Sequence, residues 1–342
     1  MNTKKGVSKI LLINFLLLAV LLFCVEIVLR ILGLGYDSAA FEPNVLYHHA
    51  HKKNYSFINN NPSEKEYSNI LVRYDKDGCV SNPNPVASSS ANKKIAILGD
   101  SYAEGLQVDF NNSITGILQK QLGKKYEIKN FAVGGYSPVI YFLQCKYVLQ
   151  EYRPDFVFLL LYSNDLREDK DFLTNAVYNN NTLVAINGGV PAFKYSLIRK
   201  SYLLRFIRKY YIMLSYALQN TSQNNYVIQN SIEEKPLLTQ PTLSYLDSIR
   251  VVLAQSNCKL IVSAVPSKYK TVNALEHDSL DFATQCRHWA AQNKTSYVDL
   301  TLPFINCIKK TGSSPFFKND IHFNEAGHSV AAVTIANYFN KQ

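Results

Sequence analysis

The sequence predicts an α/β protein in three layers, a parallel sheet with helices on both faces, joined to one N-terminal transmembrane helix. From Lys93 onward, short apolar runs alternate with segments of helical periodicity, and this alternation is typical of a parallel sheet. Near the N-terminus lies an apolar run long enough to cross a bilayer. The 342 residues, of which 47% are hydrophobic and 18% charged, suffice for an anchor and one large globular domain.

The N-terminal segment carries three lysines ahead of an apolar run from Ile10 to Val25, which resumes after Glu26 and continues to Leu32. Glu26 and Arg30 are spaced as i and i+4, so an ion pair can form on one helix face near the far interface. We therefore predict that residues 1–35 form a cytoplasmic stub and a single transmembrane anchor.

Two features argue against cleavage of this segment. A signal peptide would have a shorter apolar core followed by small residues in an A-x-A pattern, and Cys24 follows Leu22 and Phe23 rather than the small residues of a lipoprotein site. Lysines before the span and few after it place the N-terminus in the cytoplasm. The rest of the chain is then predicted to be extracytoplasmic, in a periplasm or at a cell surface.

The chain after the anchor divides into a linker, residues 36–92, and a main domain, residues 93–342. The linker is rich in Pro, Asn and Ser, but Ile70 to Tyr74 followed by an Asp-Lys-Asp-Gly turn reads as a strand, so we expect it to pack on the domain. An insertion at about 167–235 contains a basic, aromatic helical segment from Ser196 to Ala217. Its alternatives are an amphipathic surface helix, a lid, or a patch for lipid headgroups or an acidic polymer.

The elements of the main domain are justified one by one by apolar runs and by capping residues. Ser113 and Asn324 are placed to cap helices, and Pro138 suits a first helical position. The predicted strands are Ile95–Leu98, Tyr126–Phe131, Phe156–Leu161, Leu260–Val265 and Tyr297–Leu300. The predicted helices extend approximately over Ser113–Leu122, Ser137–Tyr152, Leu243–Gln255, Ser279–Asn293 and Glu325–Phe339.

Charge and cysteines exclude several classes of protein. The net charge of +10 would suit nucleic acid, an anionic membrane or an acidic polymer, but no nucleic-acid-binding motif accompanies it. No C-x-x-C pair, metal motif or nucleotide motif is present, so no cofactor is expected. Cys145 and Cys258 lie in apolar segments and are predicted to be buried. Five of the six cysteines follow the anchor, and their disulfide pairing stays open.

The first chemical feature is Ser101, which follows the first predicted strand in a Gly-Asp-Ser triplet. Ligands of doubly wound sheets bind at the carboxyl ends of the strands, so a serine there can present its hydroxyl to a substrate. Near the other end of the chain, Asp320 and His322 are two residues apart. Asp320 can accept the Nδ1–H of His322 and leave Nε2 free as a general base.

Oxyanion donors are the other requirement of acyl transfer. Gly134 and Gly135 follow the second strand and Asn164 follows the third. A glycine N–H can approach a substrate closely, and an Asn amide can donate to a developing oxyanion. Each of these loops is unremarkable alone, but all converge on one edge of the sheet. Their conjunction predicts a serine hydrolase with Ser101, His322 and Asp320 as the catalytic residues.

These motifs together resemble the SGNH hydrolase family, also called GDSL esterases, whose parallel sheet is flavodoxin-like. The similarity covers roughly 93–342, and the anchor resembles that of membrane-tethered members. The resemblance implies that the backbone N–H groups of Ser101 and Gly135 and the side-chain amide of Asn164 form the oxyanion hole. The four blocks read ILGDSYAEG from Ile97, NFAVGGYS from Asn130, SND from Ser163 and DIHFNEAGH from Asp320.

Two departures from the family pattern bear on the function. Ser163 stands where a glycine is usual, two residues before Asp165. The carboxylate lies one residue closer to His322 than in the common Asp-x-x-His spacing, with Asn319 in the usual position. The shorter spacing occurs in branches related to polysaccharide O-acetylation. His328 is predicted to be a helix residue without a catalytic role.

The function implied is an extracytoplasmic serine esterase that removes acyl groups, acetyl in the first place, from a cell-envelope carbohydrate or lipid. One alternative is an O-acetyltransferase that modifies an exported polysaccharide together with a membrane acyltransferase partner. Another is a non-catalytic envelope-binding protein on a decayed hydrolase fold, which the presence of Ser101, Asn164 and His322 disfavours.

Overall fold

The computed structural model describes residues 2–32, 41–59, 66–67, 69–83, 93–188, 200–207, 210–211, 238–268, 271, 281–318 and 320–342. The chain divides into two compact units. The first comprises Met1–Ser38 and Val190–Gln229, and the second comprises Ala39–Gly189 and Asn230–Gln342.

The first unit is built on helix α1 (Asn2–Ile31). Its segment Lys9–Ile31 is long and apolar enough to span a membrane, with a mean hydropathy of 2.9. The expected ion pair is present, with Arg30 Nε 2.8 Å from Glu26 Oε1. The other predicted feature of this unit, a helix over Ser196–Ala217, is helical at 202–207 and 210–211, and its remaining residues lie largely outside the described part of the chain.

Glu26 also holds the start of the 202–207 helix. Its carboxylate accepts hydrogen bonds from the backbone N–H groups of Tyr202 and Leu203, at 3.0 and 2.8 Å, and from Ser201 Oγ at 2.9 Å. The two N–H groups have no partner within the helix, as at any helix N-terminus, and an anion satisfies them well. Arg205 is buried, with its guanidinium 4.2 Å from the centre of the Tyr202 ring.

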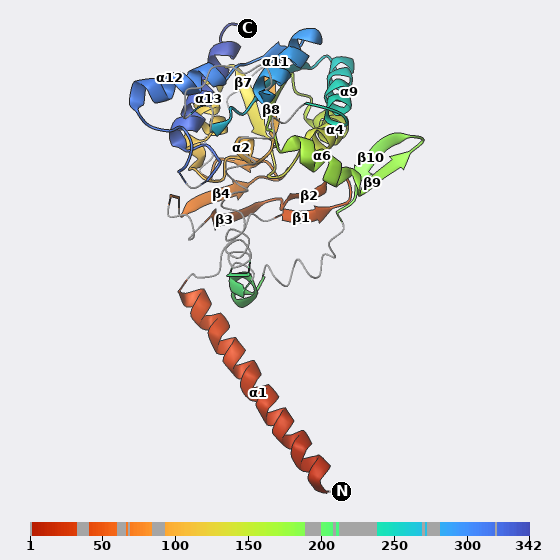
Figure 1. Ribbon diagram of the computed structural model, residues 1–342, viewed down its shortest axis with the longest axis vertical. Coiled ribbons are helices and arrows are strands. Elements are labelled where there is room, and N and C mark those ends of the chain that lie inside the picture. Colours follow the sequence, from red (N-terminus) through yellow and green to blue (C-terminus); the bar gives the residue numbers. More distant parts are fainter. Residues whose placement is uncertain are drawn as a thin grey trace. The chain divides into compact units, whose positions relative to one another are not determined.

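The second unit is organised around a sheet in which the described residues form eight strands (Figure 1). Five of the strands are parallel, and in chain order their sequence across the sheet is 2-1-3-4-5, the flavodoxin-like order. Three antiparallel strands from the segment before Lys93 extend the sheet beyond β7. Across the sheet the strands are β12 (Ser296–Tyr297), β11 (Lys259–Ala264), β8 (Phe156–Leu161), β6 (Lys93–Gly99), β7 (Tyr126–Asn130), β5 (Val80–Ser81), β4 (Ile70–Tyr74) and β3 (Tyr55–Asn59).

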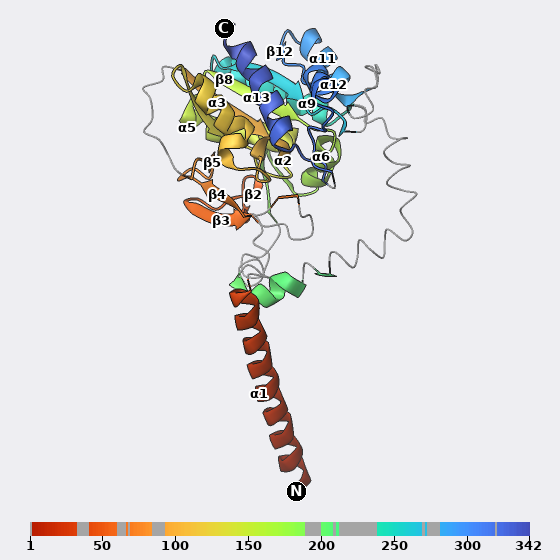
Figure 2. The same ribbon diagram turned by 90° about the vertical axis from the view of Figure 1, so that its left-hand side faces the viewer.

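Helices cover both faces of the parallel strands, so the predicted three-layer α/β/α fold is confirmed. Along β6, Ile95 and Ile97 face one layer while Ala96 and Leu98 face the other, as the period of two requires. In Figure 2, α3 and α13 run together over the first of these faces. That layer contains α3 (Ile114–Leu122), α12 (Thr301–Thr311) and α13 (Glu325–Phe339), and the opposite layer contains α4 (Pro138–Lys146), α5 (Val148–Tyr152), α9 (Thr242–Gln255) and α11 (Phe282–Gln292).

The predicted caps are present. Ser113 Oγ accepts from the N–H of Gly116 at 3.2 Å, and Asn324 Oδ1 accepts from the N–H of Gly327 at 3.1 Å. The helix predicted from Ser137 to Tyr152 is instead two helices that meet at Tyr147, where φ of −118° and ψ of −59° depart from ideal helix angles. The Gln150 side chain donates to the Cys145 carbonyl beside this break.

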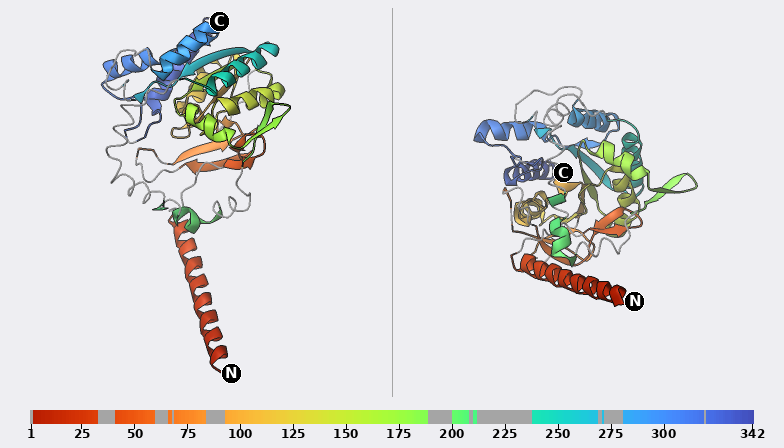
Figure 3. Two further views of the ribbon diagram at one scale, coloured as in Figure 1. Left: turned by 45° about the vertical axis from the view of Figure 1, so that its right-hand side comes forward. Right: turned by 60° about the horizontal axis from the view of Figure 1, so that its bottom comes forward.

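Several smaller elements of the structure were not predicted. Helix α12 begins directly after Leu300, where a strand was predicted to end. The other unpredicted elements are the strands β3 and β5, two hairpins and three short helices. Of these, the β9–β10 hairpin projects from the unit (Figures 1 and 3). Their bounds are β1 (Phe41–Asn44), β2 (His48–His51), β9 (Ala176–Asn179), β10 (Thr182–Ile186), α2 (Ser101–Glu104), η1 (Phe110–Asn112) and α6 (Asp165–Leu173).

All six cysteines lie within the described residues, and each is a free thiol. Cys145 and Cys258 are buried, as predicted, and they pack in the hydrophobic cluster on the α4 and α9 side of the sheet.

Candidate active site

The carboxyl ends of β6, β7 and β8 bring the candidate residues to one edge of the sheet. Strand β6 lies between the other two, and its ladder with β7 continues past the strands through a hydrogen bond from Val133 N to the Gly99 carbonyl at 3.2 Å. The loops that follow these three strands therefore start side by side. Ser101 lies on the first loop, Gly135 on the second and Asn164 on the third.

Ser101 opens the short helix α2, directly after a tight turn. Asp100 caps this helix, because its Oδ1 accepts from the N–H of Tyr102 at 3.0 Å. Gly99 permits the turn, since a Cβ there would lie 2.7 Å from Ala103 Cβ and 3.0 Å from the Leu160 carbonyl oxygen. The turn places Ser101 beyond the end of the strand, in a half-buried position.

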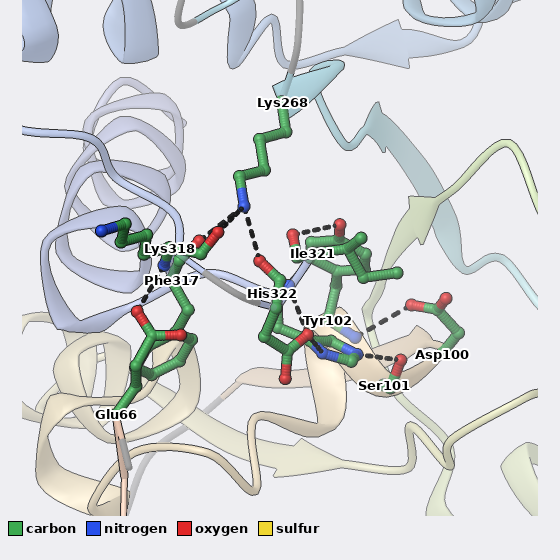
Figure 4. Close-up of polar contacts among 10 residues, drawn as sticks. Glu66, Asp100, Ser101, Tyr102, Lys268, Phe317, Lys318, Ile321 and His322 are labelled. Carbon is green, nitrogen blue, oxygen red and sulfur yellow. Dashed lines mark hydrogen bonds and ion pairs between the residues drawn. The ribbon is translucent and has the colours of Figure 1, made fainter. Parts of the chain in front are cut away.

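Ser101, His322 and Asp320 form a hydrogen-bonded row, in which Figure 4 shows the His322 ring bonded to Ser101. Asp320 Oδ1 lies 2.6 Å from His322 Nδ1 and also accepts from the His322 backbone N–H at 3.1 Å. Because the carboxylate can only accept, Nδ1 carries the proton and Nε2 is free. His322 Nε2 lies 2.8 Å from Ser101 Oγ and can accept its proton. The structure thus brings together the three residues that the sequence singled out.

The loop that carries Asp320 and His322 is fastened from two other elements. Lys268 Nζ donates to three backbone carbonyls of this loop, those of Phe317 at 2.6 Å, Asp320 at 2.9 Å and Lys318 at 3.0 Å. The Tyr102 hydroxyl donates to the Ile321 carbonyl at 2.6 Å. Figure 4 shows the Lys268 ammonium above the loop and Tyr102 below it. Lys268 was not among the predicted site residues. The one feature of the sequence that could have indicated it is its position shortly after the fourth parallel strand.

We expect the Lys268→Met variant to lower kcat for ester hydrolysis about tenfold, since hydrogen bonds from a charged donor are worth about 1.5–3 kcal/mol. The thioether fills the space of the lysine stem but cannot donate, so the Asp320–His322 loop loses its fixed position. Steady-state kinetics on the full-length protein in detergent measure the effect. Lys310→Met, an exposed position on α12, is the matched control. Equal kcat in both variants would contradict this role of Lys268.

Within the described part of the chain, the backbone N–H groups of Ser101 and Gly135 have no hydrogen-bond partner. Gly135 has a φ of +78°, the value that the third residue of a type II turn requires, and the turn is closed by a bond from Tyr136 N to the Val133 carbonyl at 3.1 Å. Gly134 lies beside the serine, because a Cβ built on it would be 3.7 Å from Ser101 Cβ.

Asn164, the third predicted oxyanion donor, lies at the start of α6. One N–H of its amide donates to Glu168 Oε1 at 3.1 Å, and the amide carries a second N–H. Burial, reinforced by the charge of Asp100, raises the pKa of Glu168 to about 8. At neutral pH the Glu168 carboxyl is therefore mainly uncharged, which limits the negative charge beside a developing oxyanion.

Two opposing effects act on the pKa of His322. Burial lowers the pKa of His322, but the hydrogen bond and charge of Asp320, with the charges of Asp100 and Glu104, outweigh it, so the pKa lies above the ordinary histidine value. Burial also raises the pKa of Asp100 to about 6. An imidazolium at His322 is thus stabilised, as a general base that holds a proton during the reaction requires.

The second histidine of the last block does not belong to this row. His328 is fully buried in α13, where its Nδ1 accepts from the Ile114 N–H at 3.4 Å. Burial lowers its pKa to about 3, so it is neutral at physiological pH and packs as part of the core. Asn319, the residue at the alternative carboxylate position, lies outside the described residues.

The parallel sheet and the serine, histidine and aspartate at its edge define the class of α/β serine hydrolases. The sequence matches the model of the GDSL-like lipase/acylhydrolase family over residues 97–330. The chain belongs to this family, and it is an ester hydrolase.

Several solved structures are also similar to this chain. TesA is 15% identical, with a TM-score of 0.42, and the match covers 73% of this chain and 99% of that one. A member of the lipolytic G-D-S-L family from Veillonella parvula is 13% identical at a TM-score of 0.42, covering 73% and 99%. A catalytic mutant of Axe2, an acetylxylan esterase from Geobacillus stearothermophilus, is 12% identical at a TM-score of 0.42, covering 73% and 95%. A search of curated proteins gave no match.

Proposed function

We propose that the protein is a membrane-anchored serine esterase that removes acyl groups, acetyl in the first place, from a cell-envelope carbohydrate or lipid outside the cytoplasm. The observation that carries this proposal is the row of hydrogen bonds from Asp320 through His322 to Ser101, at 2.6 and 2.8 Å. A serine hydroxyl is a weak nucleophile until an adjacent base takes its proton, and this row supplies the base in the required tautomer.

The mechanism is a two-step acyl transfer. As Ser101 Oγ attacks the ester carbonyl, its proton passes to His322 Nε2 and the carbonyl oxygen becomes an oxyanion. When the tetrahedral intermediate collapses, the carbon–oxygen ester bond breaks and the leaving alcohol takes the proton from His322. Water then gives a proton to His322 and attacks the acyl-enzyme, which releases the carboxylic acid and restores Ser101. Asp320 remains an ionised hydrogen-bond acceptor throughout and stabilises the imidazolium.

The oxyanion would be held by the unpartnered N–H groups of Ser101 and Gly135 and by the Asn164 amide. Donors that are fixed before the reaction need no reorganisation as charge develops. The helix α2 cap at Asp100 and the type II turn at Gly135 supply this fixation. The steps described above use only these residues, the ester and water.

The test of the reaction uses the full-length protein in detergent with p-nitrophenyl esters of increasing acyl length. We expect hydrolysis that is fastest for acetate, and release of acetate from acetylated envelope polysaccharide. Adding a sugar acceptor separates the two acyl-transfer outcomes, because an O-acetyltransferase would form an acetylated sugar faster than free acetate. No turnover with any ester and no acetate release would contradict the esterase.

The proposed location rests on the anchor and on its flanking charge. The span Lys9–Ile31 follows two further lysines, Lys4 and Lys5, and the positive-inside tendency places such lysines in the cytoplasm. Protease added to intact spheroplasts should then degrade the hydrolase domain. Protection of the domain in spheroplasts, with digestion only in inverted vesicles, would reverse this topology.

A further inference from the structure

The hairpin β1–β2, which precedes the hydrolase fold in the chain, lies against the loop that carries Gly135. Three histidines, His48, His49 and His51, lie on this hairpin, and each has a hydrogen-bond partner. His51 is buried between the Gly78 carbonyl, at 2.8 Å, and Glu104 Oε1, at 2.5 Å. The hairpin is therefore fixed to the loop after β6 as well as to the loop after β7.

His49 directly contacts the loop that carries Gly134 and Gly135. Its Nε2 lies 3.0 Å from the carbonyl oxygen of Gly134. That carbonyl belongs to the same rigid peptide unit as the N–H of Gly135, because a peptide bond is planar and trans. Whatever orients the Gly134 carbonyl therefore orients the Gly135 N–H in the opposite direction.

The protonation of His49 follows from its partners. The Gly134 carbonyl can only accept, so Nε2 carries the proton. Burial, as the largest influence, lowers the pKa of His49 to about 4, so the ring is neutral and its Nδ1 is an acceptor. His48 Nδ1, at 3.0 Å, then donates to His49 Nδ1. The chain of donors runs from His48 through His49 to the Gly134–Gly135 peptide.

The Gly134–Gly135 peptide is the central peptide of a β-turn, which can take either of two orientations. Val133 to Tyr136 form the turn, and types I and II differ mainly by a flip of the central peptide, here Gly134–Gly135. Glycine at both central positions permits either orientation. The hydrogen bond from His49 selects the orientation with a φ of +78° at Gly135.

The His49 backbone is itself clamped from the same loop. The Tyr136 hydroxyl donates to the His49 carbonyl, and the two rings meet edge to face with centroids 5.0 Å apart. The Phe41 ring meets the His49 ring in the same way at 5.1 Å. Both the backbone and the ring of His49 are therefore held in place, and its Nε2–H has a fixed direction.

We propose that His49 is a positioning residue of the oxyanion hole, which fixes the Gly134–Gly135 peptide so that the Gly135 N–H points at the developing oxyanion. The same hydrogen bond draws electron density toward the Gly134 carbonyl and strengthens the Gly135 N–H as a donor, as linked hydrogen bonds do. This inference rests on the proposed function, because it assigns Gly135 to the acyl-transfer reaction.

The test compares His49→Asn with His49→Gln in the full-length protein. A glutamine amide N–H can reach about as far as histidine Nε2, whereas the shorter asparagine cannot reach the Gly134 carbonyl. We expect His49→Asn to lower kcat for p-nitrophenyl acetate about tenfold, with KM within about twofold, since one well-placed neutral hydrogen bond is at stake. His49→Gln should keep kcat within about threefold of wild type.

A boronic acid inhibitor supplies the readout that a merely structural role would not change. It forms a tetrahedral adduct with the serine and places an oxygen in the oxyanion hole, so its Ki should rise by the same factor as kcat falls in His49→Asn. Equal losses in the Asn and Gln variants, or a boronic acid Ki that does not change, would overturn the inference. If His49→Asn does not fold, Tyr136→Phe, which frees only the His49 carbonyl, should raise the Ki in the same direction; an unchanged Ki there would also overturn it. A wild-type protein without esterase activity would instead refute the proposed function.

Discussion

Replacing Ser101 by alanine is expected to lower kcat for p-nitrophenyl acetate by about 10⁴-fold or more, the range found when a serine nucleophile is removed. The Ser101→Ala variant keeps the helix α2 cap, because the cap is formed by Asp100 and the Tyr102 N–H. It removes only the hydroxyl that lies 2.8 Å from His322 Nε2. The fold should therefore persist, and the loss should lie in kcat rather than in stability.

The matched control is Ser313→Ala, an exposed serine that follows α12. A fluorophosphonate probe gives an independent readout, since it should label Ser101 in wild type and leave Ser101→Ala unlabelled. A second test is non-additivity. When residues act as a unit, removing them together lowers kcat little more than removing one of them. The double variant Ser101→Ala/His322→Ala should therefore be no slower than the slower single variant. Substantial activity in Ser101→Ala would show that another residue is the nucleophile.

The main elements were predictable because a buried parallel strand leaves a plain signal. Phe156 to Leu161 is apolar at every position and buried at every position, as expected for a strand covered on both faces. The site was predictable for a related reason. In such a sheet the chain always emerges at the carboxyl end of a strand, so Ser101, Gly135 and Asn164 had to start from one edge.

What could not be predicted depends on contacts between distant parts of the chain. His49 and Gly134 are 85 residues apart, and Lys268 and Asp320 are 52 apart; periodicity within a short window contains no information on such pairs. Helix α12 was missed for a local reason. Its Pro303 discourages a helix, yet it lies in the first turn, where the missing N–H has no intrahelical partner to lose.

The insertion shows the same limit on a larger scale. Its basic, aromatic segment was open to three interpretations. In the described part of the chain, Glu26 and Arg30 of the anchor helix form hydrogen bonds with this segment. Arg205, one of its cations, is buried against Tyr202. Composition predicted a helical segment but could not identify the glutamate that caps its described part, because Glu26 is 176 residues from Tyr202.

Replacing Asp320 by asparagine is expected to lower kcat by about 10³–10⁴-fold, although the amide is nearly the same size as the carboxylate. The Asp320 carboxylate accepts both from His322 Nδ1 and from the His322 backbone N–H. An amide that turns its NH₂ toward the ring favours the wrong tautomer, with the proton on Nε2, and His322 can then no longer accept the proton of Ser101.

The pH dependence should change along with the rate. His322 must be neutral to act as a base, so activity falls as the pH drops through its pKa, which in wild type lies above the ordinary histidine value. In Asp320→Asn the hydrogen bond to the carboxylate and its charge are both lost, and burial, the largest influence, then lowers the pKa. The acid limb of kcat/KM should therefore move to lower pH while the plateau falls, measured from about pH 5 to pH 9.

Asp299→Asn is a fitting control, because Asp299 is a partly buried carboxylate outside the hydrogen-bonded row and accepts from the Thr301 N–H at 2.8 Å. It should leave both the plateau and the acid limb in place. An Asp320→Asn variant with an unshifted acid limb would mean that the ionising base in the profile is a group other than His322. A shifted limb with an undiminished plateau would mean that Asp320 tunes the charge of His322 without setting its tautomer, and the hydrogen-bonded row would then act through electrostatics alone.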